Sequence, residues 1–106
     1  MSGQNTKATA DKQDSGITTI ECAESVDIRF VEDIQATLIE AIDQGKPTRI
    51  NAKNVERIDT AGLQLFSSFM NDAQLKGIKV EWDQPSEVVI KAAKLTGLSS
   101  VLNLDL

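Results

Sequence analysis

The residues with the clearest potential for chemistry stand together in one stretch, Asp59-Thr60-Ala61-Gly62-Leu63-Gln64. A carboxylate and a hydroxyl precede a small residue and a glycine, where an apolar stretch ending at Ile58 meets a long amphipathic pattern. That order is typical of a junction between a strand and the N-terminus of a helix, where unpaired backbone N–H groups gather and carry partial positive charge. A hydroxyl at such a junction can cap the helix, contact a partner or carry a phosphate.

Two interpretations of this stretch remain open from the residues alone. In the structural one, Asp59 or Thr60 caps the helix, which contributes about 1 kcal/mol relative to alanine, and Gly62 permits close packing where a Cβ would clash. In the functional one, Thr60 protrudes at the edge of an apolar patch, contacts a partner protein and is a candidate phosphoacceptor. A phosphate adds about −1.5 to −2 units of charge, which a helix N-terminus tolerates and a desolvated apolar interface does not.

The composition argues against several other classes of function. The chain has 106 residues, a net charge of −5 and no histidine. It therefore lacks a basic footprint for nucleic acid, and it lacks the commonest general base and metal ligand. Cys22 follows Glu21, which disfavours a thiolate, so we expect this cysteine to fill core space. We expect that the protein is not an enzyme and has no catalytic residue, cofactor or metal, because the sequence shows no set of base, nucleophile and orienting group.

Features of membrane-inserted and exported proteins are also missing from the sequence. No apolar run approaches the ~20 residues that a membrane span needs, and the N-terminus lacks the apolar region of a signal peptide. A single cysteine cannot form an internal disulfide, which fits a reducing compartment. These features predict a cytoplasmic protein without direct membrane insertion.

The N-terminal part of the chain predicts a tail followed by two strands. Residues 1–15 are polar and are expected to form a flexible tail, so the folded domain is expected to span residues 16–106. β-Branched residues predict a strand over 17–20. Alternating apolar residues predict a second strand over 26–30, and the short gap between the two predicts a hairpin.

The rest of the chain alternates between helical and strand periodicity. Apolar residues at helical spacing predict helices, glycines and prolines mark their ends, and apolar residues at alternate positions predict strands. The expected elements are a helix over 31–44 ended by Gly45, the central strand over 48–55, a helix over 60–76, a half-buried strand over 78–82, and a third helix opened by Ser86 and closed by Gly97.

Three further expectations concern side chains in these elements. Asn51 interrupts the alternation of the central strand and is a candidate buried polar residue that needs partners. The helix over 60–76 carries extra apolar residues at its flank, Leu65 and Phe69, which make a weak homodimer feasible. The inner face of the third helix is expected to consist of Val89, Ala92, Ala93 and Leu95.

The element order β-β-α-β-α-β-α predicts the fold class. We expect an α/β domain with a single mixed sheet of about four strands and with helices packed mainly on one face. The two strand-helix-strand steps imply parallel pairing and right-handed connections, while the opening hairpin would make the sheet mixed.

The chain resembles the STAS domains, the family of anti-sigma factor antagonists and sulfate-transporter tails, over residues 17–104. In that family a strand ends in an apolar residue that is followed by Asp, a hydroxyl residue, a small or second hydroxyl residue, Gly and Leu. The matching residues here run from Ile58 to Leu63, within the segment INAKNVERIDTAGL. The resemblance implies the STAS-like (SpoIIAA-like) fold and a non-enzymatic regulatory role.

Two positions depart from the family pattern. The phosphorylated antagonists of the family usually carry Asp-Ser-Ser-Gly and are modified on the Ser directly before Gly, but that position here is Ala61, which cannot accept a phosphate. Asn51 stands where many members have Asp. The Asp-Thr-small-Gly version resembles the STAS subunit of the phospholipid-asymmetry ABC transporter, where this Thr contacts the ATPase, and stand-alone STAS proteins of signalling systems.

The resemblance implies a protein partner that docks at the start of the second predicted helix. The first hypothesis is an anti-sigma factor antagonist-like module whose partner is an anti-sigma factor, a serine/threonine kinase or another signalling kinase, with Thr60 as the candidate phosphorylation switch. The alternative is a cytoplasmic accessory subunit that contacts the ATPase of a phospholipid-transport ABC transporter. In both, the contact residues are Thr60 and its neighbours: Asp59, Ala61, Gly62, Leu63 and Gln64.

Overall fold

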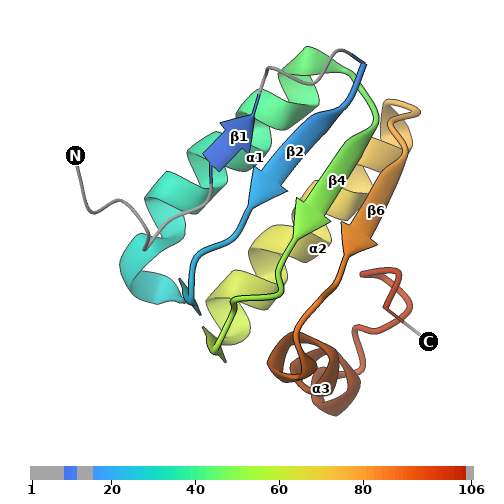
Figure 1. Cartoon of the computed structure of the whole chain (residues 1–106). Coiled ribbons are helices and arrows are strands. Elements are labelled where there is room, and N and C mark those ends of the chain that lie inside the picture. The colour runs from blue at the N-terminus through green and yellow to red at the C-terminus, as the bar shows by residue number, and fades with distance from the viewer. Residues whose placement is uncertain (1–8, 12–15, 105–106) are drawn as a thin grey trace.

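The structure is a computed structural model that describes residues 9–11 and 16–104 (Figure 1). Its three helices fall in the predicted order, and the structure adds two short strands that were not predicted, at residues 9–11 and 57–58, and a short 3-10 turn, η2, before the first helix. They are β1 (Thr9–Asp11), β2 (Thr18–Glu21), β3 (Ser25–Val26), η2 (Ile28–Phe30), α1 (Val31–Gln44), β4 (Thr48–Asn51), β5 (Arg57–Ile58), α2 (Thr60–Leu75), β6 (Val80–Asp83) and α3 (Glu87–Thr96).

The main sheet has four strands in the order β1-β2-β4-β6. β2, β4 and β6 run parallel to one another, and β1 pairs antiparallel with β2, with Ala10 opposite Ile20. The predicted mixed sheet of about four strands is therefore confirmed. Its antiparallel member comes from residues 9–11, within the segment expected to be a tail; residues 1–8 and 12–15 of that segment lie outside the described residues.

The predicted hairpin between residues 17–20 and 26–30 is wrong. β3 pairs in parallel with β5 in a separate two-stranded sheet, with Val26 opposite Ile58. The Asp27 carboxylate accepts a hydrogen bond from the Arg29 backbone N–H at 3.0 Å and caps the turn η2. This hydrogen bond favours a turn over an extended conformation at residues 28–30, although apolar residues alternate there as in a strand.

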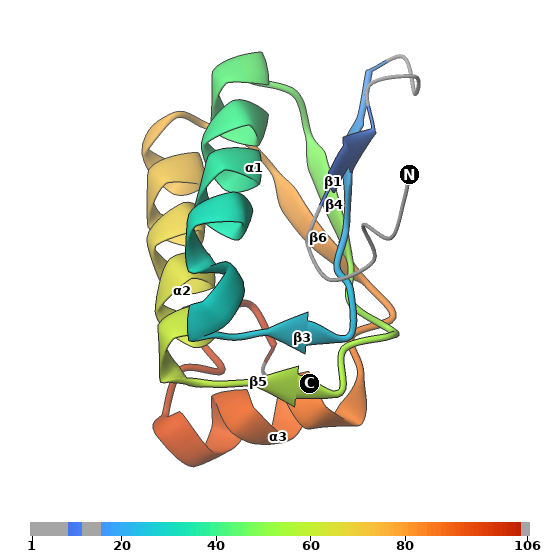
Figure 2. The same cartoon turned by 90° about the vertical axis from the view of Figure 1, so that its left-hand side faces the viewer.

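The helices form one layer and one end cap. α1 and α2 cover one face of the main sheet, and α3 runs beneath β3 and β5 at one end of the domain (Figure 2). α1 has the predicted bounds and ends at Gly45, whose φ of 68° is a left-handed conformation that glycine adopts without strain. The Ser86 hydroxyl caps α3 as predicted, accepting from the Val89 N–H at 3.3 Å.

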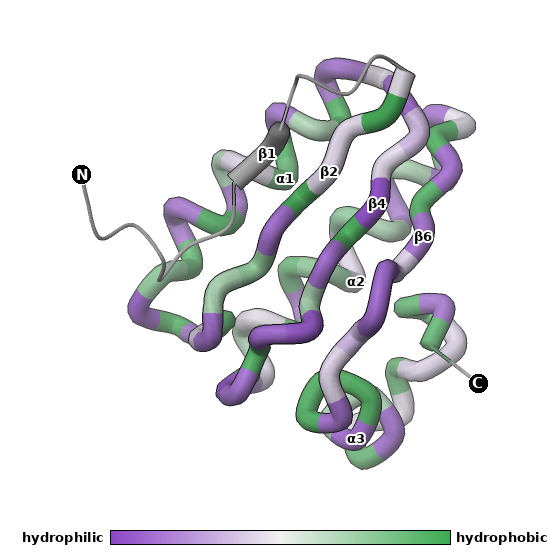
Figure 3. Tube along the Cα trace, in the orientation of Figure 1, coloured by the Kyte–Doolittle hydropathy of each residue, from purple (hydrophilic) through white to green (hydrophobic). Residues whose placement is uncertain are grey.

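The core lies between the main sheet and the helix layer. Apolar and polar residues alternate along β4 and β6 (Figure 3), so that each strand turns one face to the core. Phe66 of α2 packs against Trp82 of β6 with ring centroids 5.5 Å apart. The residues buried most completely include Ile20, Ile34, Ile50, Phe66, Val89, Leu102 and Leu104.

Two side-chain expectations need correction. Leu95 of α3 is 77% exposed and does not belong to the inner face of that helix, because it stands six residues after Val89 and therefore about 120° around the helix from it. Phe69 is buried and Leu65 is partly buried against the core, so neither forms an exposed apolar flank of α2. The expected weak homodimer stays a prediction.

Candidate functional site

Asp59 is the residue that joins the start of α2 to the rest of the domain. Its backbone is extended, and its Oδ1 accepts a hydrogen bond from the Gly62 N–H at 2.9 Å, which caps the helix. Its Oδ2 accepts from the Ile28 N–H at 3.0 Å, although the two residues are 31 positions apart in sequence. One carboxylate therefore satisfies backbone donors of two separate elements.

Gly62 allows the first turn of α2 to lie directly on β3. A Cβ at this position would come within 2.9 Å of Val26 Cγ1 and still closer to the Val26 carbonyl oxygen. The oxygen belongs to the backbone and cannot move aside as a flexible side chain would. The structural interpretation of Gly62 therefore holds: the glycine is present because the two backbones approach closely.

Thr60 has a different environment from the residues on both sides. It is the first residue of α2 and is exposed, and within residues 9–11 and 16–104 its hydroxyl has no hydrogen-bond partner. Because Asp59 makes the cap, the hydroxyl of Thr60 is not needed for the helix.

The other predicted contact residues divide between surface and core. Gln64, one turn further along α2, is also exposed. Ala61 is partly buried, whereas Leu63 is 2% exposed and belongs to the core. Of the residues predicted from the motif, Thr60 and Gln64 thus present their side chains most openly.

An open groove of about 510 Å³ lies beside the Asp59 carboxylate. Its residues come from three places in the fold: the β3–η2 segment, β5 with the residues on both sides of it, and the first turn of α3. Two of its apolar side chains are exposed, Ile28 at 63% and Val88 at 39%. The full lining is Asp27, Ile28, Arg29, Glu56, Arg57, Ile58, Asp59 and Val88.

Two of the charged groups of the groove, Asp27 and Arg29, form an ion pair. Arg29 Nη2 lies 2.7 Å from Asp27 Oδ2, and the hydrogen bond from Arg29 lowers the pKa of the Asp27 carboxyl below its usual value. The same bond raises the pKa of Arg29. The guanidinium also lies 5.0 Å from the centre of the Phe30 ring. These contacts fix the Arg29 guanidinium beside the Asp27 carboxylate, in a groove whose lining combines the apolar side chains of Ile28, Ile58 and Val88 with charged ones.

The sequence did not predict that this surface would include Ile28, Arg29 and Val88. Ile28 and Arg29 were assigned to a strand, and Val88 precedes a residue expected to be in the core. All three reach the groove only because β3, β5 and α3 meet at one end of the domain. The exposed apolar pair was not recognisable from local periodicity.

Other candidate chemical groups are less open. Cys22 is buried, and burial together with the nearby Glu21 charge raises the pKa of its thiol to about 12, so it stays protonated and unreactive at neutral pH. Asn51 is partly buried, and its side-chain oxygen accepts from the Lys53 N–H at 3.1 Å.

Two kinds of feature are absent from residues 9–11 and 16–104. No three side chains of the Cys, Asp and Glu types come together there in a way that could hold a metal ion. No helix in the same residues has the length and apolar character needed to span a membrane.

Comparisons with known proteins identify relatives of this chain. The family model for the STAS domain matches residues 8–106. The anti-sigma-B factor antagonist of Bacillus subtilis (strain 168) is 24% identical over 94 residues, which cover 89% of this chain and 86% of that protein.

Solved structures show the same fold. The anti-sigma factor antagonist SpoIIAA in its unphosphorylated form has a TM-score of 0.72 and 22% identity, covering 88% of this chain and 83% of that one. The Bacillus cell fate determinant SpoIIAA in the phosphorylated form has a TM-score of 0.69 and 21% identity, covering 88% and 86%. The expected SpoIIAA-like fold is thereby confirmed.

Proposed function

The chain belongs to the STAS domain family, and on that basis we propose that it is a non-enzymatic, anti-sigma factor antagonist-like binding module. It docks on a kinase-type protein partner, such as an anti-sigma factor with serine/threonine kinase activity, in the cytoplasm. The docking surface consists of the start of α2 and the neighbouring groove, and phosphorylation of Thr60 switches binding off.

The observation that carries this proposal is the separation of scaffold from contact group at the start of α2. Asp59 and Gly62 fix the position of the helix through backbone contacts. Thr60, between them, is exposed and makes no side-chain hydrogen bond within residues 9–11 and 16–104. A change at Thr60 therefore alters the surface without removing a contact on which the fold depends.

The electrostatics of this surface support a negative-charge switch. A phosphate on Thr60 would lie next to the Asp59 carboxylate, whose Oδ1 already accepts the N–H of Gly62. The added charge would therefore remain hydrated at the surface in the free protein. A partner that covers Ile28 and Val88 would have to desolvate that charge, which is costly without a matching cation.

A second candidate function rests on Ala61. The residue directly before Gly62 has no hydroxyl, so the position that the family usually modifies is closed to phosphorylation. In this candidate Thr60 stays unmodified and contacts the ATPase of a phospholipid-transport ABC transporter, to which the chain is an accessory subunit. The two candidates share the docking surface and differ in the partner and in the use of the hydroxyl.

The test is affinity capture from native lysate with the wild type, Thr60→Glu, Thr60→Ala and Ser68→Glu. Ser68 is exposed on the same helix two turns away, so Ser68→Glu adds the same charge outside the docking surface. We expect the wild type and Ser68→Glu to capture the same partner and Thr60→Glu to lose it. Equal capture by Thr60→Glu and the wild type would contradict the docking surface.

Incubation of the captured complex with ATP then separates the two candidates. A kinase partner should add one phosphate to the wild type and none to Thr60→Ala, as read by intact mass. An ABC ATPase partner that leaves Thr60 unmodified would support the transporter candidate and contradict the phosphorylation switch.

A further inference from the structure

The outer edge of β6 is a second surface of the domain that the proposed function does not use. β6 is the last strand in the order β1-β2-β4-β6, so one of its edges has no neighbouring strand in the described part of the chain. The Lys79 carbonyl accepts a hydrogen bond from the Thr48 N–H at 2.8 Å and so points toward β4. Because backbone groups alternate in direction along a strand, the N–H and C=O groups of Val80 and Trp82 point outward.

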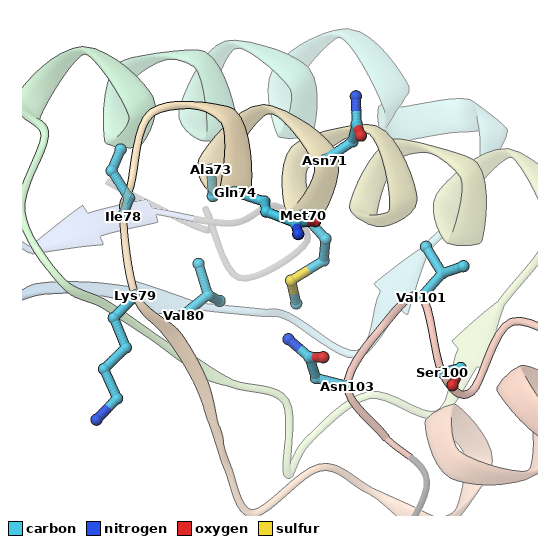
Figure 4. A pocket seen from close by; sticks show the side chains of 10 residues that line it. All are labelled: Met70, Asn71, Ala73, Gln74, Ile78, Lys79, Val80, Ser100, Val101 and Asn103. Carbon is cyan, nitrogen blue, oxygen red and sulfur yellow. The ribbon is translucent and has the colours of Figure 1, made fainter.

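A hollow of about 640 Å³ borders this edge on the helix side (Figure 4). Met70 and Gln74 of α2 line one side, Val80 lines another, and Val101 and Asn103 of the C-terminal turn face them. The indole Nε1 of Trp82 donates to the Leu102 carbonyl at 2.7 Å, which holds the C-terminal turn at the far end of β6. The C-terminal turn thus lies near the Trp82 end of β6, where Asn103 and Leu104 line a second hollow with the strand, and the larger hollow borders its Val80 end.

Proteins usually protect such an edge with a proline, a bulge, charged side chains, or a helix or loop that covers it. The chain has no proline or glycine from Ile78 to Asp83, the last residue of β6. Val80 and Trp82 are both partly buried. The charges on the exposed face of β6 have both signs, because Lys79 and Glu81 are adjacent on that face, 75% and 54% exposed. Their ion pair joins β6 to the residue just before it, is 3.5 Å long and is exposed to solvent, so replacing it with a pair to another chain costs little free energy.

This pattern is self-complementary in one antiparallel register. If Val80 faces Val80 of a second copy, the outward N–H and C=O groups of the two residues can pair with each other. In that register Lys79 of each copy lies opposite Glu81 of the other, which gives two attractive cross-strand pairs. The same arrangement places Val80 beside Val80 at the larger hollow of each copy. The contact is related by a two-fold axis, so it closes as a dimer and does not propagate into a fibre.

We propose that a second copy of this chain pairs with β6 through its own β6 edge and forms a weak antiparallel dimer. The contact extends the main sheet across the two copies and leaves the start of α2 free for the partner protein. It does not depend on the proposed function, since it uses none of the residues around Thr60.

The test compares charge variants of the full chain by sedimentation equilibrium from micromolar to millimolar concentrations. In the dimer, Lys79→Glu places the new glutamate of each copy opposite Glu81 of the other copy. Glu81→Lys places the new lysine of each copy opposite Lys79 of the other copy. We expect each single variant to weaken the dimer about tenfold, because two attractive pairs become repulsive. An equimolar mixture of the two single variants should restore association, as should the double variant Lys79→Glu/Glu81→Lys.

Controls make the result specific. Lys91→Glu changes an exposed charge of α3 and should dimerise like the wild type, and thermal unfolding should show that all variants fold. A monomeric wild type over the whole concentration range overturns the proposal. So does a dimer that is unaffected by both single variants, or one that neither the mixture nor the double variant restores.

Discussion

The two ends of α2 differ in how the chain constrains them. At its start, the Asp59 carboxylate binds backbone N–H groups of Gly62 and Ile28, and Gly62 lies against the Val26 backbone. At its end, the helix runs into Lys76 and Gly77 and leaves an open hollow beside β6. The first end is held by these contacts and presents one hydroxyl, whereas the second lies beside a strand edge that has no neighbouring strand in the described residues.

This difference explains why one helix can serve two kinds of contact. Recognition of a different protein benefits from a fixed surface, because little conformational freedom is lost on binding. Pairing of identical strands needs exposed backbone groups and a self-complementary charge pattern, and tolerates a more open surface. Four changes test the contrast, beginning with the one expected to have the largest effect.

Gly62→Ala should destabilise the fold by about 3 kcal/mol, at the upper end of what overpacking costs, because the new Cβ meets the Val26 backbone. Gly77→Ala is the matched change at the other end of α2, where a Cβ would meet no atom within 4 Å and the cost is the positive φ of 72° alone. That cost is about 1 kcal/mol. Urea unfolding measures both, and equal losses would remove the contrast in packing.

Asp59→Ala should lower the free energy of unfolding by about 2 kcal/mol, because both the helix cap and the bond to Ile28 are lost. Ser86→Ala removes only the cap of α3 and should cost about 1 kcal/mol. Thermal unfolding of the two variants gives the comparison. If Asp59→Ala costs no more than Ser86→Ala, the carboxylate acts as an ordinary cap and does not join two elements.

Ile28→Lys should weaken partner binding by about 1–2 kcal/mol while leaving stability within about 0.5 kcal/mol, since the side chain is 63% exposed. Leu75→Lys makes the same change at the other end of α2, where the leucine is 78% exposed. It should leave both quantities unchanged. Titration calorimetry with the captured partner measures binding, and equal weakening by both variants would place the docking surface elsewhere.

Arg29→Ala should have the smallest effect, and the effect should depend on pH. Arg29 lowers the pKa of the Asp27 carboxyl in the folded protein, so the pair stabilises the fold at pH values above 3.8, the ordinary pKa of an aspartate. That stabilisation is lost as the pH falls through the lowered pKa of the folded state. Unfolding curves of the wild type and the variant should therefore differ slightly at pH 7 and converge in strong acid. A difference that persists unchanged in acid would mean that Arg29 acts through packing on Phe30.

The sequence was sufficient for elements whose signals are local. α1 has the predicted bounds because a helical apolar period ends at a glycine that takes a left-handed conformation. The beginnings of α2 and α3 were predicted because Asp59 and Ser86 are side-chain caps that act within three residues. The position of Thr60 as the first residue of α2 follows from the same local geometry, because the residue after the cap starts the helix.

Elements that depend on distant partners could not be predicted in the same way. β3 and β5 have two residues each, and each is a strand only because the other lies beside it. The alternation of Val26, Ile28 and Phe30 suggested an extended strand, but the Asp27 cap bends the chain after β3. Leu95, by contrast, was misplaced for a local reason, since it stands six residues after Val89 and therefore about 120° around the helix from it; it is 77% exposed.

The amino-acid sequence alone determined the family resemblance, the helix boundaries and the position of Thr60 as the first residue of α2. Periodicity and capping were sufficient for these because they act over a few neighbouring residues. Tertiary structure alone decided that Ile28, Arg29 and Val88 surround that position, because these side chains meet only after β3, β5 and α3 have packed together. It also decided that β6 is an edge, since strand order depends on pairing between segments far apart in the chain.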